Sequence, residues 1–294
     1  MSRESPYATD QYATTMQEMF AAVTDLYARH WGDFFHFALF DNGEQSWEEA
    51  IQKTHRRYLD DIRLDGAQKV IELACGRGGF SNLMAQNTQA DVLGVDIAPA
   101  QLAHTRRHKR HNLRFKQHDI MHIDELDEMF DAVVFMDAAC YLPDKAKAVS
   151  KISRIMNPGA RFLLIEWCKR EGLNRFQEEL VLEPFMNYWA VPGLETMDSY
   201  EKYFTRAGLT ILKMEDLTPS VRRNWDHGYE QAVQGIQRLS FRDIAGLARK
   251  GLRVGRRGLQ LMKEQFPAAI YIKVGFDAGF LRYAYFLVEK PADG

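Results

Sequence analysis

Apolar and polar positions alternate in blocks through the central part of the chain. Short, nearly continuous apolar runs predict buried strands, and segments with apolar residues every three or four positions predict helices. The expected strands are Lys69–Leu73, Asp91–Asp96, Leu113–Gln117, Asp131–Met136 and Arg161–Trp167, with helices near 79–87, 99–110 and 144–156. This alternation predicts an α/β fold with a mainly parallel, doubly wound sheet. Its faces are covered by helices, and ligands bind at the carboxyl ends of its strands.

The remainder of the chain is expected to complete this domain rather than to form a second one. Two more strands are predicted at Thr210–Leu217 and Tyr283–Glu289, and residues 157–159 (Asn-Pro-Gly) predict a turn before the fifth strand. No repeat or low-complexity stretch is present, so residues 1–294 are expected to form a single domain. Its parts are a helical, aromatic-rich lid at 1–65, a core at 66–171, and helical cap insertions at 172–206 and 218–275.

The connection after the first strand is the most informative feature. Residues 72–79 read Glu-Leu-Ala-Cys-Gly-Arg-Gly-Gly, and the next strand ends at Asp96. Glycines let the backbone approach a ligand where a Cβ would clash. An acid roughly 20 residues on binds ribose hydroxyls in nucleotide-binding βαβ units. Because loop and acid occur together, a nucleotide site is favoured over the alternative of a tight turn and a solvated Asp.

The same loop departs from the dinucleotide fingerprint G-x-G-x-x-G, and an acid, Glu72, stands at the end of the strand. A carboxylate at that place repels a pyrophosphate and suits an ammonium group. The expected ligand therefore carries a ribose and a cationic amino acid, as S-adenosylmethionine (SAM) does.

This segment resembles the first motif of the class I SAM-dependent methyltransferases, acid-x-Gly-x-Gly-x-Gly, with Ala74 in place of a glycine. The resemblance implies a Rossmann-like sheet of seven strands, the last antiparallel, and SAM as the cofactor. It also implies that Asp119, after the third strand, binds the adenine amino group; taken alone, Asp119 would be interpreted as a helix cap. The cofactor residues implied are Glu72, Ala74, Gly76, Gly78, Asp96, Ile97, Gln101, Asp119 and Ile120.

An aromatic run at residues 25–37 is the second informative feature. It contains Trp31-Gly32 and His36-Phe37, and it resembles the Trp-Gly-x-x-x-His-Phe segment of sterol C-methyltransferases and related small-molecule enzymes. That resemblance implies that Trp31 and His36 close over the cofactor, where aromatic faces bind the sulfonium cation. The alternative is a helix packed on the core.

The residues after the fourth strand bear on the reaction. Related sugar O-methyltransferases have acid-x-x-His-His-x-Pro-Asp here, whereas this chain reads Asp137-Ala-Ala-Cys-Tyr141-Leu-Pro-Asp144, without the histidines. An acid followed by tyrosine resembles the prenyl-diphosphate C-methyltransferases, in which an alkene attacks the methyl group and a carboxylate stabilises the carbocation. Asp137 is thus expected to be the base or cation stabiliser, with Tyr141 beside it. The alternative is that Asp137 accepts hydrogen bonds within the loop.

Two further titratable residues, Glu166 and His55, lie on predicted elements of the core and the lid. Glu166, at the end of the fifth strand beside Trp167, is expected either to hold a cation or hydroxyl or to pair with an arginine. His55 is a lone histidine in a predicted helix and is interpreted as structural.

Two groups of basic residues in the second insertion have more than one interpretation. Arg222 and Arg223 follow an Asp-Leu-Thr-Pro stretch that resembles prenyl-diphosphate methyltransferases, and they bind a diphosphate or remain solvated. Residues 242–263 form a basic amphipathic pattern that meets an anionic acceptor, a membrane surface or only water.

Composition narrows the function class. The 294 residues have a formal net charge of −2, which gives no reason to expect a nucleic-acid partner. Three scattered cysteines (Cys75, Cys140 and Cys168) predict neither a disulfide framework nor a metal site. With no signal-peptide pattern and no apolar run of about 18 residues, we expect a cytoplasmic protein, with homo-oligomerisation left open.

The expected activity is C-methylation of a small, largely apolar isoprenoid, with a prenyl diphosphate as one acceptor considered. The alternative is O- or N-methylation of a natural-product hydroxyl, sugar or amine. A third hypothesis is a catalytically silent SAM-binding protein that acts through interactions.

Overall fold

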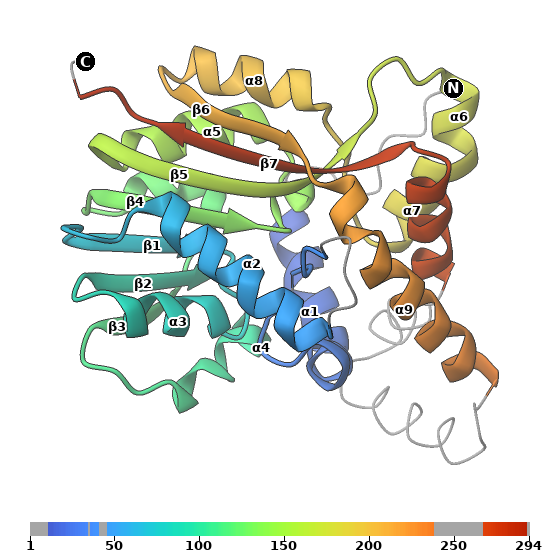
Figure 1. The fold of residues 1–294 in the computed structure, drawn as a ribbon, viewed down its shortest axis with the longest axis horizontal. Helices are drawn as coiled ribbons and strands as arrows, with labels where there is room; N and C mark the ends of the chain where they lie inside the picture. Colours follow the sequence, from blue (N-terminus) through green and yellow to red (C-terminus); the bar gives the residue numbers. More distant parts are fainter. Residues whose placement is uncertain (1–10, 35, 41–45, 238–266, 293–294) are drawn as a thin grey trace.

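A seven-stranded sheet organises the molecule, in the order β3-β2-β1-β4-β5-β7-β6. The computed structural model describes residues 11–34, 36–40, 46–237 and 267–292. Strands β1 to β5 run parallel, and β7 pairs antiparallel with both β5 and β6 (Figure 1). The predicted fold class is confirmed, including the antiparallel last strand.

The five inner strands are mainly apolar and buried, as is usual for strands covered on both faces, whereas the two edge strands, β3 and β6, are largely exposed. Their bounds are β1 Lys69–Leu73, β2 Asp91–Asp96, β3 Leu113–Gln117, β4 Phe130–Met136, β5 Met156–Lys169, β6 Thr210–Asp216 and β7 Leu281–Glu289. The helices are α1 Tyr12–Trp31, α2 Trp47–Ile62, α3 Gly79–Asn87, α4 Pro99–Leu102, α5 Lys145–Arg154, α6 Arg175–Gln177, α7 Glu183–Tyr188, α8 Met197–Arg206 and α9 Thr218–Gln237, and a further helix covers 267–277.

Helices cover both faces of the sheet. Helix α2 starts with a capping box, in which the Ser46 hydroxyl accepts the Glu49 N–H and the Glu49 carboxylate accepts the Ser46 N–H. The buried stripe of α2 faces β4 and β5, and α3 packs on β1, β2 and β3. Both helices lie on the face of the sheet that is toward the viewer in Figure 1. Helix α5 packs against α8 on the opposite face.

The remaining helices gather at the carboxyl ends of the parallel strands. In Figure 1, α1 lies at this edge, and α6, α7 and α9 lie beyond it. Helix α8 instead packs on α5 and β6, so the second half of the predicted insertion at 172–206 covers the sheet rather than the edge. The first half, 175–188, lies with α9 and the helix at 267–277 at the strand ends.

Two local predictions were wrong. The helix expected over 99–110 ends at Leu102 and gives way to a short 3-10 turn, because residues 104–111 offer no apolar side chain to bury. Residues 157–159 were expected to form a turn before the fifth strand, but they belong to β5. The pairing of β5 with β4 shifts register at this place. Gly159 has a positive φ of 79° there, and its N–H bonds to the Lys290 carbonyl.

Among the described helices, none combines the length and the apolar character that a membrane span needs. The basic segment 242–263 lies outside the described residues.

Candidate active site

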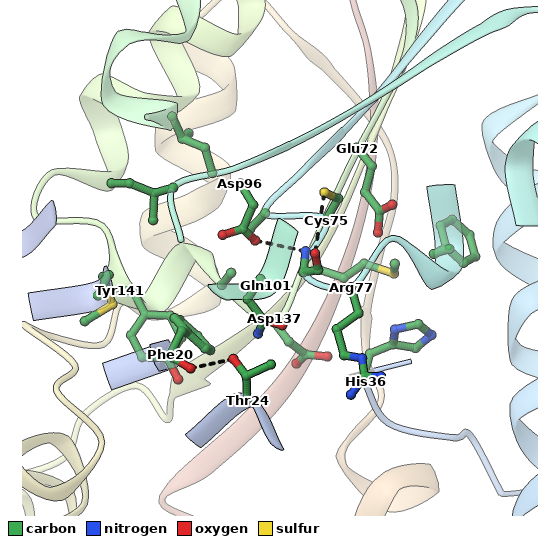
Figure 2. A pocket seen from close by; sticks show the side chains of 18 of the residues that line it. Phe20, Thr24, His36, Glu72, Cys75, Arg77, Asp96, Gln101, Asp137 and Tyr141 are labelled. Atoms are coloured by element: carbon green, nitrogen blue, oxygen red, sulfur yellow. Dashed lines mark hydrogen bonds between the residues drawn. The ribbon is translucent and has the colours of Figure 1, made fainter. Parts of the chain in front are cut away.

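A cavity opens at the carboxyl ends of β1, β2 and β4, where α1 crosses the sheet edge. Its space, including solvent at the mouth, is about 1020 Å³. The described wall comes from α1 and the loop after it, the glycine loop, and the ends of β2 and β4 (Figure 2). The wall does not include residues 172–206 or the described part of 218–275. The pocket is thus built from the core and the N-terminal segment.

The glycine loop and Asp96 form one unit. The Gly76 N–H donates to Asp96 Oδ2 at 2.9 Å, and the Ala98 N–H donates to Oδ1 at 2.8 Å (Figure 2). Ala74, Gly76 and Gly78 all have positive φ angles, between 53° and 78°. Ala74 has this left-handed conformation without being a glycine, which costs about 1 kcal/mol. The loop therefore exposes backbone toward the cavity beside a carboxylate.

Gly78 has a packing role, since it does not line the cavity. A Cβ on Gly78 would lie 2.6 Å from the Phe115 ring. On the neighbouring Gly79, a Cβ would lie 2.5 Å from the Asp33 carbonyl oxygen, because the loop after α1 rests on the start of α3. These two glycines bring separate chain segments together around the pocket.

Glu72 is a buried carboxylate at the end of β1. The Ser81 hydroxyl donates to its Oε2 atom, and its side chain points into the cavity (Figure 2). Burial raises the pKa of Glu72 to about 8. Burial likewise raises the pKa of Asp96 to about 6, against the backbone N–H groups that favour its charged form. Within the part of the chain that the structure describes, no cation favours the charged form of either acid.

Gln101 and Ile97 complete this side of the wall. The Gln101 side-chain oxygen is buried and has no hydrogen-bond partner among the described residues. A buried amide oxygen without a donor costs about 1–3 kcal/mol, so a ligand donor here is favourable. The orphaned Gln101 oxygen and the two acids fit a ligand with hydroxyl and ammonium groups.

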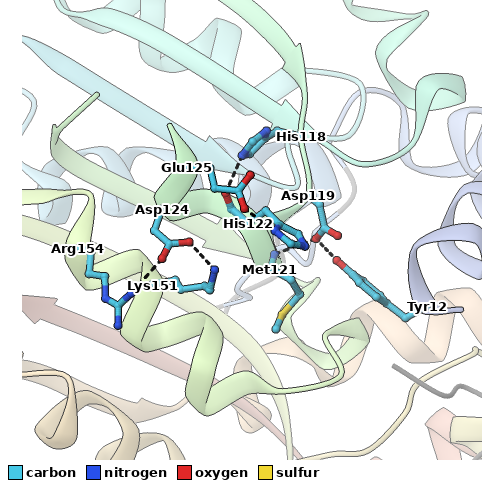
Figure 3. A network of polar contacts seen from close by, with 9 residues as sticks. All are labelled: Tyr12, His118, Asp119, Met121, His122, Asp124, Glu125, Lys151 and Arg154. Atoms are coloured by element: carbon cyan, nitrogen blue, oxygen red, sulfur yellow. Dashed lines mark hydrogen bonds and ion pairs between the residues drawn. The ribbon is translucent and has the colours of Figure 1, made fainter. Parts of the chain in front are cut away.

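Asp119 lies outside the cavity wall, although Ile120 belongs to it. The Tyr12 hydroxyl and the Met121 N–H both donate to Asp119 Oδ1 (Figure 3). Asp119 is the N-cap of a 3-10 helix, Ile120–Glu125. The structure thus shows the capping alternative, and it adds a link that the sequence did not indicate, between α1 and the end of β3.

His36 lies in the cavity wall and is half of a buried pair. Its Nε2 atom is 2.6 Å from Nε2 of His55. Burial lowers the pKa of His36 well below its usual range and that of His55 to about 4, so both rings are neutral near pH 7. His55, interpreted from sequence as structural, is therefore the direct partner of a wall residue. The side chain of Trp31 lies outside the described part of the structure.

Asp137 follows β4, on the other side of β1 from Asp96, and it lines the cavity with 9 % of its surface exposed. Trp167 Nε1–H donates to Oδ1 at 2.8 Å, and the Tyr283 hydroxyl donates to Oδ2 at 2.8 Å. Asp137 has a φ of +55°, a strained backbone for a non-glycine residue. Burial raises the pKa of the Asp137 carboxyl well above its usual range, against the Tyr283 hydrogen bond, and nearby Glu166 raises it further.

Apolar side chains surround Asp137 on the cavity side. Tyr141 contacts Phe20 of α1 edge-on, with ring centroids 5.9 Å apart. Met136 and Leu142 line the same end. Tyr141 and Asp137 thus both line the cavity, and Tyr141 lies next to Phe20 in Figure 2.

Glu166, expected from sequence to act in the site, does not line the cavity and is 0 % exposed. The Cys140 N–H donates to its Oε2 atom at 3.0 Å and the Trp167 N–H to Oε1 at 2.6 Å. Glu166 therefore accepts backbone N–H groups behind the described cavity wall rather than lining it.

Behind Asp137 lies an aromatic cluster that centres on Trp167. Ring centroids of six aromatic residues lie 5.2–6.4 Å from that of Trp167, namely Phe37, Phe185, Trp189, Trp225, Phe276 and Tyr283. They come from the N-terminal segment, α7, α9, the 267–277 helix and β7. The cap elements thus meet at the residue that holds Asp137.

Arg222 and Arg223, considered for a diphosphate, do not line the described cavity wall. Arg222 pairs with Asp277 at 3.1 Å, and the Arg223 guanidinium lies 4.6 Å from the Phe40 ring centroid.

A model of the methyltransferase domain family matches residues 64–208, which hold the glycine loop, Asp96 and Asp137. The chain is a SAM-dependent methyltransferase with a class I fold. SAM is the cofactor of this methyltransferase, and the cavity at the glycine loop has the features that such a ligand needs.

Curated relatives of the methyltransferase cover it to different extents. The tocopherol O-methyltransferase of Arabidopsis thaliana is 23% identical over 97% of this chain and 84% of that protein. The sterol 24-C-methyltransferase of Aspergillus fumigatus is 32% identical, but over 58% of this chain and 46% of that protein. The chain thus spans less than half of the fungal protein that it matches.

Solved structures show the same fold. The [4+2]-cyclase SpnF superposes with a TM-score of 0.72 and 21% identity, covering 95% of this chain and 96% of that one. The geranyl diphosphate C-methyltransferase of Streptomyces coelicolor A3(2) gives 0.67 and 14% identity, over 95% and 97%. At these identities the likeness concerns the fold and does not assign the reaction.

Proposed function

We propose that this methyltransferase transfers the methyl group of SAM to a carbon of a small isoprenoid. The observation that carries the proposal is the part of the cavity wall after β4. There the buried carboxylate Asp137 lines the cavity together with Met136 and Tyr141, and Tyr141 packs against Phe20 of α1. An apolar alkene fits such a wall. Burial disfavours the charged form of Asp137, but a cation beside it favours that form, and the ionised carboxylate then stabilises the cation and accepts its proton.

The other end of the cavity is proposed to hold the cofactor. The Glu72 carboxylate binds the ammonium group of SAM, and Asp96 accepts hydrogen bonds from the ribose hydroxyls. The side-chain oxygen of Gln101 accepts a hydrogen bond from another donor of the ligand. SAM supplies a methyl group that is already activated by its sulfonium. The protein then positions the acceptor, excludes water and handles one proton.

Similarity to known enzymes supports an isoprenoid-like acceptor. The relatives named above act, by their names, on tocopherol and on the carbon-24 position of sterols. A neutral isoprenoid suits the described wall better than a diphosphate does, because Arg222 and Arg223 lie away from it.

O-methylation of a hydroxyl on such a molecule is the second candidate. The neutral His36 in the cavity wall favours it, since a histidine near a hydroxyl is a general base. The similarity to a tocopherol O-methyltransferase over 97% of the chain points the same way.

Tritiated-methyl SAM tested against neutral isoprenoids, sterols, prenylated phenols, prenyl diphosphates, glycosides and amines separates these functions. With deuterium at the accepting carbon, C-methylation followed by loss of the proton from that carbon releases the deuterium into water, whereas O-methylation retains it. The position of the tritiated methyl group in the product identifies the new bond in either case. We expect labelled isoprenoid and released deuterium. Transfer only to glycosides or amines would contradict the proposed acceptor, and transfer to a hydroxyl would support the second candidate.

A further inference from the structure

The carboxylate of Asp137 is oriented by two residues that the sequence did not connect to it. Trp167 Nε1–H and the Tyr283 hydroxyl each take one of its oxygens, at 2.8 Å. Its own N–H donates to the Ile165 carbonyl at 2.9 Å, although its φ is +55°. A strained residue persists only where its surroundings over-determine it. The surroundings of Asp137 are therefore part of how the site works.

Glu166 completes a closed ring of contacts that includes Asp137, its loop and Trp167. One of its oxygens accepts the Cys140 N–H, on the loop that begins at Asp137, and the other accepts the Trp167 N–H. The Trp167 indole in turn donates to Asp137. The contacts run from Asp137 along its loop to Cys140, through Glu166 to Trp167, and back to Asp137.

We propose that Glu166 is a positioning residue, which sets the direction of the Asp137 carboxylate through the 138–141 loop and Trp167. The inference rests on the proposed role of Asp137 and deepens it. Glu166 is 0 % exposed and outside the cavity wall, so it acts through other residues. Lys145 is buried, and its Nζ donates to the Leu142 carbonyl at 2.8 Å. Its positive charge favours the ionised form of Glu166.

A glutamate is suited to this place because the loop offers it donors. Cys140 lies in a short 3-10 helix, Ala139–Tyr141, and the first N–H groups of a helix have no partner within it. A carboxylate is an acceptor at both oxygens, whereas a glutamine turns an NH₂ group toward one of the two donors. Glu166→Gln therefore preserves shape while it breaks the ring at one link.

The test compares Glu166→Gln with Asp131→Asn at pH 8, above the pKa of about 7 to which burial raises Glu166. Asp131 also accepts two backbone N–H groups, from Gln68 at 2.7 Å and Lys69 at 3.0 Å, but at the other end of the sheet. We expect Glu166→Gln to lower kcat roughly tenfold to a hundredfold, as a displaced catalytic group does. The SAM Kd is expected to stay within about twofold, and Asp131→Asn to keep kcat.

Trp167→Phe removes the indole donor from the same ring and is expected to lower kcat similarly. The double variant with Glu166→Gln is expected to fall little below the single variants, because both break one ring. A full additive loss, or an unchanged kcat in Glu166→Gln, would overturn the inference.

A second readout does not need the acceptor. In a proton–nitrogen spectrum of the five tryptophan indoles, the Trp167 signal is assigned by its loss in Trp167→Phe. We expect it to move in Glu166→Gln and to stay in Asp131→Asn. A Trp167 signal unmoved by Glu166→Gln overturns the inference, whereas failure of every acceptor in the panel would overturn only the proposed function.

Discussion

The two ends of the cavity hold their carboxylates in different ways. At the cofactor end, Asp96 is held by N–H groups of Gly76 and Ala98, and Glu72 by Ser81, all within 20 residues in the chain. At the acceptor end, Asp137 is held by the side chains of Trp167 and Tyr283, which are 30 and 146 residues away. The cofactor end depends on groups close in the chain, and the acceptor end depends on the assembled cap.

This difference separates the functions of the two ends. Backbone N–H groups in a βα loop keep their positions when side chains around them change. The Trp167 ring instead contacts rings from α7, α9 and the 267–277 helix, so a change in the cap reaches Asp137 directly. We therefore expect changes at one end to alter SAM affinity and changes at the other to alter turnover.

Asp137→Asn is expected to have the largest effect. Removal of the proposed base or cation stabiliser lowers methyl transfer about 100-fold or more, with a SAM Kd within about twofold. Single-turnover transfer and equilibrium SAM binding measure the two quantities. Asp144→Asn is the control, because Asp144 caps α5 on the same loop and asparagine caps equally well. Parallel loss of SAM binding in Asp137→Asn would contradict the separation of the two ends.

Asp96→Asn is expected to act at the opposite end. Loss of a charged acceptor for the ribose hydroxyls raises the SAM Kd roughly 10- to 100-fold, while kcat at saturating SAM changes little. Isothermal calorimetry measures the affinity. Asp91→Asn, at the exposed start of the same strand, is expected to leave it unchanged. A kcat that falls as far as the affinity would argue against the assignment.

Proton release on SAM binding reports on Glu72. Its pKa of about 8 in the ligand-free protein leaves it protonated at pH 7, and an ammonium partner favours the carboxylate. Binding at pH 7 is thus expected to release close to one proton, and above pH 9 almost none from this group. Because the folded pKa is raised, Glu72 lowers ligand-free stability as pH rises from about 4.5 to 8.

Calorimetry in two buffers with different ionisation enthalpies counts the protons. Glu72→Gln is expected to abolish most of the release at pH 7. Release that persists in Glu72→Gln would place the proton elsewhere.

Ala74→Gly is expected to give the smallest effect. A glycine relieves the left-handed conformation at a φ of 53°, and its own entropic cost offsets part of the gain, so stability rises by less than about 1 kcal/mol. Thermal unfolding is expected to shift upward by roughly 1–3 °C. A lower melting temperature would show that the Ala74 methyl group packs usefully.

The sequence predicted the cofactor end better than the acceptor end, because the first depends on residues close in the chain and the second on residues far apart. The bounds of β1, β2 and β3 agree with the apolar runs, and Glu72 and Asp96 lie where the βα pattern predicted. By contrast, the Trp167 and Tyr283 bonds to Asp137 and the His36–His55 pair join residues that only the folded chain brings together. Periodicity does not carry such contacts, and a single sequence offers no other signal for them.

A crystal structure with S-adenosylhomocysteine bound tests the central claim most directly, that one cavity has a cofactor end and an acceptor end. The account predicts the ligand's amino group at Glu72, its ribose hydroxyls at Asp96, and its sulfur directed toward Asp137 and Tyr141. A ligand whose sulfur points away from Asp137, or whose ribose lies away from Asp96, would contradict it.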